Sequence, residues 1–300
     1  MTGSALHIRA QVLQTIRRYF DQQGFLEVET PVRIPANAPE EHIDPVPALP
    51  WHLQTSPELC MKRLLCRGHR RIFQICRCWR SGERGNRHLP EFTMLEWYRA
   101  DADYRQLMDD CQGLLRAVAS TCSNDGCLRR NGAKIDTNAP WRTISLQEAF
   151  LRYAQSNALE SVEKGVFEEI LTSRVEPAFE TFDVPVLLCD YPSEMAALAR
   201  LKPDDPRFAE RFELYVAGLE LANGFSELTD PVEQRARFEA ANAYRLKQGK
   251  TALPLPEPFL NELSAMPQSA GIALGVDRLV MLAAGADSID GVVAFTPEQL

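Results

Sequence analysis

Two strand-like segments joined by a polar connection constrain the fold of this chain more than any other feature. Residues 71–80 (RIFQICRCWR) and 91–98 (EFTMLEWY) are rich in aromatic and apolar side chains, as strands are, whereas residues 81–90 between them contain glycine, proline and charge. The sequence therefore predicts an antiparallel hairpin with a long connection.

Other segments predict helices and strands around this hairpin. Apolar residues at helical spacing predict helices over 12–20, ending at Gly24, over 104–119, from Ser145, over 230–249 and over 277–285. Strands are expected at 25–32, 184–190, 211–228 with a bend near Gly218, and 271–276. We also expect Glu148 to complete a capping box with Ser145, and Asp277 to cap the last helix.

Two segments show little periodicity. Residues 33–50 carry five prolines and predict an ordered loop, and the polar residues 122–142 predict a surface excursion. With 300 residues and 45% hydrophobic content, the chain has enough apolar material for a sizeable core. We therefore expect one α+β domain over residues 1–300, with an antiparallel sheet flanked by helices.

Charge and cysteine usage restrict the classes of function. The formal net charge of −8, from 33 basic and 41 acidic residues, disfavours a nucleic-acid partner held by a basic surface. No signal-peptide pattern or membrane-spanning run is present, and the eight cysteines form no CxxC pair, which is typical of reduced thiols in a cytoplasmic protein. The five histidines are not clustered, which disfavours a structural zinc site.

The second strand of the hairpin carries polar and aromatic side chains on one face. The period-two rule places Phe92, Met94, Glu96 and Tyr98 on the same side. A carboxylate and a phenol beside apolar groups favour the floor of a pocket. The alternative is a solvated outer face with a stray aromatic residue.

Basic residues surround the hairpin connection. Arg80, Arg84, Arg87 and His88 could clamp a triphosphate, because guanidinium groups match phosphate oxygens bidentately. Surface loops are also often basic by chance, so this pattern alone is weak.

Two later segments add candidate site residues. Glu213, Glu220 and Glu227 recur at equal intervals, and such close carboxylates favour a magnesium ion or an ammonium group among them, although exposed edge-strand glutamates are the alternative. Small residues in GIALGV let a ligand lie against the backbone, and Arg278 follows at a helix start that favours anions. A glycine-tolerant packing contact is the alternative there.

Taken together and in order, these segments resemble the signature motifs of class II aminoacyl-tRNA synthetases. FLEVETPV is similar to motif 1, RCWRSGERGNRHLPEFTMLEWY to motif 2 and GIALGVDRL to motif 3. TSPELCMKRLL and ELANGFSEL resemble the lysyl-tRNA synthetase catalytic domain. Because motif 1 begins within about 25 residues of the start, leaving no room for an anticodon-binding domain, the chain most resembles the elongation factor P lysine ligases.

The resemblance implies an activity and its partners. Such a ligase would activate lysine or, preferably, (R)-β-lysine as an adenylate, with ATP and Mg²⁺, and join it to a lysine side chain of elongation factor P. It would be a cytoplasmic homodimer that dimerises through the motif 1 helix and strand, without a membrane and without tRNA as acceptor.

The resemblance also assigns site residues by position. Arg80 and Arg278 would be catalytic, with Arg80 on the α-phosphate and substrate carboxylate and Arg278 on the γ-phosphate. The substrate-binding set is Ser56, Pro57, Glu58, Glu96, Tyr98, Asn223, Phe225 and Glu227, with Glu227 neutralising the side-chain ammonium. The ATP-binding set is Arg80, Ser81, Gly82, His88, Leu89, Phe92, Glu220, Leu221, Gly275 and Arg278, and the metal ligands are Glu213 and Glu220.

Four positions depart from the lysyl-tRNA synthetase pattern. Gly82 replaces the glutamate that accepts from the adenine amino group, with Glu83 adjacent but out of register, and Leu89 replaces an asparagine. Ala222 and Ala273 replace glycines, so each adds a methyl group that trims the pocket. We read the alanines as favouring a substrate other than α-lysine.

Two rival interpretations remain at this stage. A minimal tRNA-lysylating enzyme would need a basic face, which the composition does not favour. A synthetase-like regulator without turnover is suggested by Gly82 and Leu89, but the presence of Arg80, Glu213, Glu220 and Arg278 argues against it.

Overall fold

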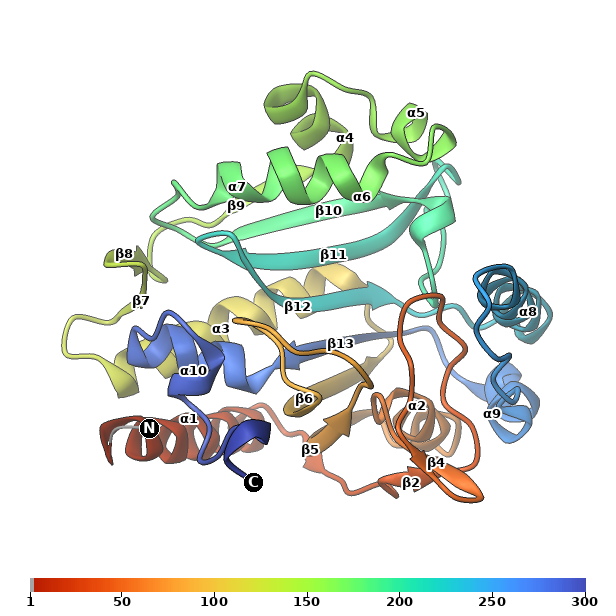
Figure 1. The fold of residues 1–300 in the computed structure, drawn as a ribbon, viewed down its shortest axis with the longest axis horizontal. Coiled ribbons are helices and arrows are strands. Elements are labelled where there is room, and N and C mark those ends of the chain that lie inside the picture. The colour runs from red at the N-terminus through yellow and green to blue at the C-terminus, as the bar shows by residue number, and fades with distance from the viewer. Residues whose placement is uncertain (1–2) are drawn as a thin grey trace.

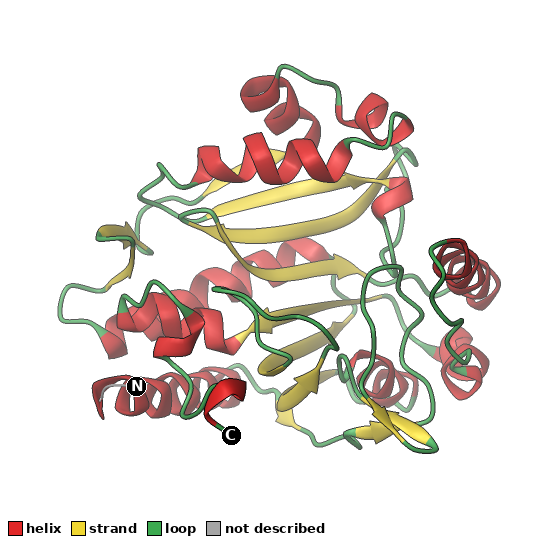
Figure 2. Ribbon diagram, viewed as in Figure 1, coloured by secondary structure: helices red, strands yellow, loops and turns green. Residues whose placement is uncertain are grey.

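A large mixed sheet organises the computed structural model, which describes residues 3–300 (Figures 1 and 2). The strand order is β1-β5-β6-β13-β12-β11-β10-β9. Most neighbours are antiparallel, and only the outermost pairs, β1 with β5 and β9 with β10, are parallel. The strands are β1 Leu26–Glu27, β5 Arg71–Trp79, β6 Glu91–Ala100, β9 Arg142–Ser145, β10 Val186–Pro192, β11 Phe208–Val216, β12 Leu219–Ser226 and β13 Ser269–Gly275.

The predicted hairpin forms the second and third strands of the sheet, next to the edge strand β1. β5 and β6 pair from Arg71 with Arg99 to Trp79 with Glu91, as the two apolar segments predicted. β13 then joins the other edge of β6, so the motif 2 and motif 3 segments lie side by side although about 180 residues separate them in sequence.

Three helices cover one face of the sheet: α1 Gly3–Gln22, α3 Tyr104–Cys122 and α10 Val276–Ala284. In Figure 1, α3 runs behind β12 and β13. Buried residues of these helices pack with the core-facing residues of the sheet, such as Leu95 and Trp97 of β6. A capping box formed by Asp103 and Gln106 starts α3, and Gly285 ends α10 in the left-handed conformation, at φ 63°.

The remaining helices form two further groups. The segments α4 Leu146–Ala149, α5 Ala158–Glu163, α6 Phe167–Ile170 and α7 Glu176–Phe179 pack beside β9 and β10. The helices α2 Glu58–Cys66, α8 Pro231–Lys247 and α9 Glu257–Glu262 gather around Tyr98 of β6. α8 begins at the N-cap Asp230, as predicted.

Two segments predicted as irregular also contain short strands. Residues 33–50 are mostly loop, as predicted, but include β2 Arg33–Ile34 and β3 Pro47–Ala48, which pair with β4 Trp51–Leu53 in a small sheet. Residues 122–142 lie mostly at the surface, as predicted, but include the hairpin of β7 Cys127–Arg130 and β8 Ala133–Asp136, whose Leu128 and Ile135 are buried in the main core.

The prediction for Asp277 was wrong. It does not cap α10, because the N-cap is Gly275, which makes no side-chain cap bond. The Asp277 carboxylate instead accepts from the Thr93 backbone at 2.7 Å and pairs with Arg9 of α1 at 2.6 Å. Ser145 does cap its helix, by accepting from the backbone N–H of Glu148, but the Glu148 side chain makes no return bond that would complete the predicted capping box. No helix within residues 3–300 is long and apolar enough to cross a membrane.

Candidate active site

Three neighbouring strands supply the floor of a cavity of about 280 Å³. The strand register aligns Glu96 with Ala273 and Asn223 in one row, and Tyr98 with Gly271 and Phe225 in the next. Side chains in such rows share a face of the sheet, so the period-two prediction for β6 is confirmed. Phe92, Met94, Glu96 and Tyr98 all line the cavity.

Most of the predicted site residues line this single cavity. They are Ser56, Glu58, Arg80, His88, Leu89, Phe92, Glu96, Tyr98, Glu220, Leu221, Asn223, Phe225, Gly275 and Arg278. Pro57, Ser81, Gly82, Glu213 and Glu227 are not among its lining residues. Pro57 is the N-cap of α2, and Ser81 donates its backbone N–H to the Asp44 carbonyl at 2.7 Å.

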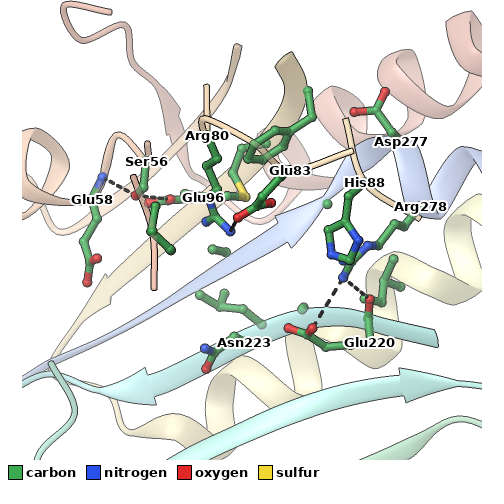
Figure 3. Close-up of a pocket in the computed structure, with 18 of the residues that line it drawn as sticks. Ser56, Glu58, Arg80, Glu83, His88, Glu96, Glu220, Asn223, Asp277 and Arg278 are labelled. Carbon is green, nitrogen blue, oxygen red and sulfur yellow. Dashed lines mark hydrogen bonds and ion pairs between the residues drawn. The ribbon is translucent and has the colours of Figure 1, made fainter. Parts of the chain in front are cut away.

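One end of the cavity holds a network around the buried carboxylate of Glu96 (Figure 3). The Ser56 hydroxyl donates to Glu96 Oε1 at 2.6 Å, and the Tyr98 hydroxyl donates to Glu96 Oε2 at 2.8 Å. The Ser56 hydroxyl in turn accepts from the backbone N–H of Glu58 at 3.0 Å. These bonds fix the carboxylate before any ligand arrives.

A buried lysine connects two further carboxylates at this end. Lys62 Nζ lies 2.6 Å from Glu58 Oε1 and 2.5 Å from Glu227 Oε2, and its side chain is 1% exposed. Glu227 Oε1 is buried and makes no hydrogen bond within residues 3–300. It lies 2.5 Å from the position that a Cβ atom on Gly271 would take, so this free oxygen faces the glycine that lines the cavity.

Burial and mutual repulsion shift the pKa values of these acids. Burial, followed by the charge of Glu58, raises the pKa of Glu96 to about 8. Burial also raises the pKa of Glu227 to about 8, although Lys62 opposes the shift. Since an added cation would favour the ionised carboxylates, this end of the cavity is suited to bind ammonium groups.

Arg80 lies near the middle of the cavity (Figure 3). Its guanidinium carbon is 5.2 Å from the centroid of the Phe92 ring, and its Nη1 is 3.8 Å from Glu83 Oε1. Gly82 adopts φ 78°, and Glu83 lines the cavity. A carboxylate is therefore present beside Arg80 although Gly82 departs from the expected motif.

The opposite end is organised by Arg278 (Figure 3). Its Nη1 donates to the Glu220 carbonyl at 2.7 Å, its Nη2 lies 2.6 Å from His88 Nε2, and its Nε donates to the Arg87 carbonyl at 3.2 Å. Burial, together with the charge of Arg278, lowers the pKa of His88. The end thus presents a fixed guanidinium and a neutral imidazole, which suit an anionic ligand.

The two predicted metal ligands occupy different environments. Glu220 lines the cavity and its carboxylate is 3.4 Å from Arg278 Nη1. Glu213 is buried and both of its oxygens have partners, Arg211 at 2.6 Å and the Tyr215 hydroxyl at 2.7 Å. No group of three or more acidic, histidine or cysteine residues positioned for a metal occurs in the described part of the chain.

The sequence did not single out several residues of the site. Lys62 lies within TSPELCMKRLL but received no role from the sequence. It follows Glu58 by four residues, and this spacing on a helix would have predicted an ion pair between them. Glu40 and Ile43 line the cavity from residues 33–50, which showed no pattern. Burial raises the pKa of Glu40 to about 7.

Comparisons with known proteins agree with this geometry. The family model described as tRNA synthetases class II (D, K and N) matches residues 1–299. A protein of Erwinia tasmaniensis named elongation factor P--(R)-beta-lysine ligase is 39% identical, over 97% of this chain and 94% of its own length. A protein of the same name from Salmonella paratyphi B is 40% identical over the same shares of the two chains.

Proposed function

We propose, because this chain belongs to the class II tRNA synthetase family, that it is an ATP-dependent ligase that activates (R)-β-lysine, or lysine, as an adenylate and transfers it to a lysine side chain of elongation factor P. The relatives named above supply the acceptor and the preferred amino acid. The acidic composition of the chain also fits a protein acceptor better than RNA.

The charge of the amino-acid end carries this proposal. Glu58 and Glu227 pair with the buried cation Lys62. Glu96 lies beside them, bonded by Ser56 and Tyr98. When all three carboxylates are ionised, three negative charges and one positive charge give this end a net charge of −2. Lysine and β-lysine each carry two ammonium groups. A diamino acid therefore supplies the two positive charges that this end requires, and Arg80 faces its carboxylate.

The remaining residues have roles that follow from their place in the cavity. Ser56, Tyr98, Asn223 and Phe225 would shape the amino-acid pocket, and Glu227 would offer Oε1 to the side-chain ammonium. ATP would lie along Arg80, Phe92, His88 and Arg278, with Leu89, Leu221 and Gly275 beside the purine. Pro57, Ser81 and Gly82 would act through the backbone, since they do not line the cavity.

The chemistry requires positioning more than proton transfer. In the first step the amino-acid carboxylate bonds to the α-phosphorus while the bond to pyrophosphate breaks, and Arg80 stabilises the added negative charge. In the second step the acceptor amine attacks the adenylate carbonyl, AMP leaves and the amine loses a proton. Arg278, fixed by three contacts, holds the departing phosphates.

Magnesium would be held at the Glu220 end. Mg²⁺ in nucleotide sites is usually bound by one or two carboxylates together with phosphates. Glu220 can serve as the exposed ligand, and Glu213 fits as a second one only if its bonds to Arg211 and Tyr215 rearrange. The ion would supply charge stabilisation at the phosphates.

We also infer a single catalytic domain, a cytoplasmic location and a homodimer. The dimer is supported by exposed apolar groups on the motif 1 elements, with Leu6 of α1 49% exposed and Leu26 of β1 53% exposed. β1 is also the edge of the sheet, and unpaired edges favour association.

Two assays test the proposal. ATP–pyrophosphate exchange is measured with α-lysine and both enantiomers of β-lysine, and we expect exchange with at least one of them. The absence of exchange with all three would overturn the proposed ligase activity. Transfer of the activated amino acid is then measured to purified elongation factor P and to tRNA. If only tRNA were labelled, the acceptor would be tRNA and not elongation factor P.

A further inference from the structure

The protein contributes an ammonium group of its own to the proposed amino-acid pocket. Besides its two carboxylate partners, Lys62 Nζ lies 5.0 Å from the centroid of the Phe225 ring. Carboxylates and an aromatic face are the groups by which proteins bind ligand ammonium ions. Lys62 therefore occupies, from below the floor, a cation site of the kind expected for the substrate.

Lys62 fixes the geometry of both acidic partners. Glu58 lines the cavity, whereas Glu227 lies beneath it with a fully buried side chain. With Oε2 held by Lys62, the free Oε1 of Glu227 faces Gly271. Without that pair the Glu227 carboxylate would have no fixed orientation toward the cavity floor.

Building on the proposed function, we propose that Lys62 is a positioning residue that sets the charge of the amino-acid pocket, so that the pocket accepts two ammonium groups and not three or one. The charged groups that interact with it are Glu58 on its own helix, Glu227 after β12 and, more weakly, Glu96 on β6, to which the Tyr98 hydroxyl donates. Glu40 faces Glu58 from the segment before β3.

Removal of the positive charge should make the substrate compete with protons. Lys62 opposes the rise in the pKa values of Glu96 and Glu227. Without Lys62, the three neighbouring carboxylates would retain their protons to a still higher pH, because like charges disfavour ionisation. A diammonium substrate would then have to displace more tightly held protons before binding. The amino-acid KM would rise near pH 7, while kcat with bound substrate would change little.

The test compares Lys62→Met with wild-type enzyme in ATP–pyrophosphate exchange from pH 6 to 9. We expect the KM for the amino acid at pH 7 to rise about tenfold and the rising limb of kcat/KM to move up by about one pH unit, with kcat within a few-fold. Lys62→Arg, which keeps the charge, should restore most of the pH profile. Lys164→Met is the matched control, because Lys164 pairs with Glu160 at the same helical spacing on the surface at 3.0 Å.

Chemical rescue provides a second readout that a packing role would not produce. In Lys62→Ala, a vacated site lined by two carboxylates should bind added ethylammonium, which would lower the amino-acid KM. Ethylammonium should have no effect on Lys62→Met, whose side chain fills the site. If Lys62→Met does not fold, Lys62→Gln, which can still donate to the carboxylates, should show the same pH displacement.

The outcomes separate the two proposals. A wild-type enzyme that shows no exchange with any lysine isomer would overturn the proposed function. If the wild-type enzyme shows exchange but kcat/KM for the amino acid rises at the same pH in folded Lys62→Met or Lys62→Gln, only the role of Lys62 would be overturned.

Discussion

The two ends of the cavity hold their charges in different ways. At the amino-acid end, Lys62, Glu96 and Glu227 are almost fully buried and bind one another or neighbouring hydroxyl groups. At the phosphate end, the side chains of Arg80 and Arg278 are 24% and 17% exposed, and Arg278 is held mainly by backbone carbonyls. The first end is thus built to select a ligand by charge and shape, and the second to hold a large, highly charged one.

The phosphate end should show the largest mutational effect. Arg80→Ala removes the guanidinium that we place on both the α-phosphate and the substrate carboxylate, and it should lower kcat/KM in pyrophosphate exchange by about 10²–10³-fold. Arg84→Ala is the control, because Arg84 points away to Glu298 and Asp290 at 2.9 Å each. Comparable losses in the two variants would mean that charge on the loop, and not the position of Arg80, matters.

The amino-acid end should be the less tolerant of added volume. A Cβ atom on Gly271 would overlap the Tyr98 ring and lie 2.5 Å from Glu227 Oε1, whereas one on Gly275 would be 3.6 Å from the nearest Arg278 atom. Gly271→Ala should cost about 1–3 kcal/mol of stability and raise the amino-acid KM tenfold or more, with the ATP KM unchanged. Gly275→Ala should melt at the wild-type temperature, as differential scanning calorimetry can determine. Equal tolerance at both positions would contradict the contrast between the two ends.

The pH dependence should also belong to the amino-acid end. Because the pKa values of Glu96 and Glu227 are raised to about 8, ammonium binding requires loss of protons at neutral pH. We expect kcat/KM for the amino acid to rise by about fiftyfold or more from pH 6 to 8 and to level off only above about pH 9. The ATP KM should not follow the same curve, and parallel curves would place the titrating groups elsewhere.

The same shifts predict how stability depends on pH. For these carboxyls the folded-state pKa lies above the unfolded value near 4.5, so they stabilise the empty protein fully at low pH and lose that contribution as pH rises through about 8. The contribution of these two carboxyls should therefore lower the melting temperature of the empty enzyme as the pH rises from about 4.5 to about 8. Saturating amino acid should reverse part of the fall, and a pH-independent ligand-induced shift would argue against charge selection.

Most of the strands and helices that carry the site could be predicted from the sequence, because strand alternation and helix-ending glycines are local properties. Alternation alone placed Glu96 and Tyr98 on the pocket floor. It could not place Glu220 correctly relative to Asn223, since the odd spacing would put them on opposite faces of a regular strand. A bulge at Leu221, where β11 and β12 shift register, brings Glu220 to the cavity side.

Other features depended on neighbours distant in the chain. Asp277 looked like a helix cap, but its carboxylate is taken by Arg9 and by the Thr93 backbone, which come from two other elements. The burial of Lys62 between Glu58 and Glu227 likewise requires α2 to pack against the end of β12. Neither arrangement has a signature within one segment, so local patterns could not predict them.

The smallest expected effect concerns the shape of the amino-acid end. Ala273 stands between Glu96 and Asn223 in the same strand row, so its methyl group lies on the pocket floor. Ala273→Gly should change the ratio of kcat/KM for α-lysine to that for (R)-β-lysine by less than about tenfold, in favour of α-lysine, since one methyl-sized change in a pocket gives modest discrimination. Ala270→Gly on the core face of the same strand is the control for flexibility. If the ratio changed equally in both variants, the effect would come from a more flexible β13 backbone. The charges alone would then account for substrate selection.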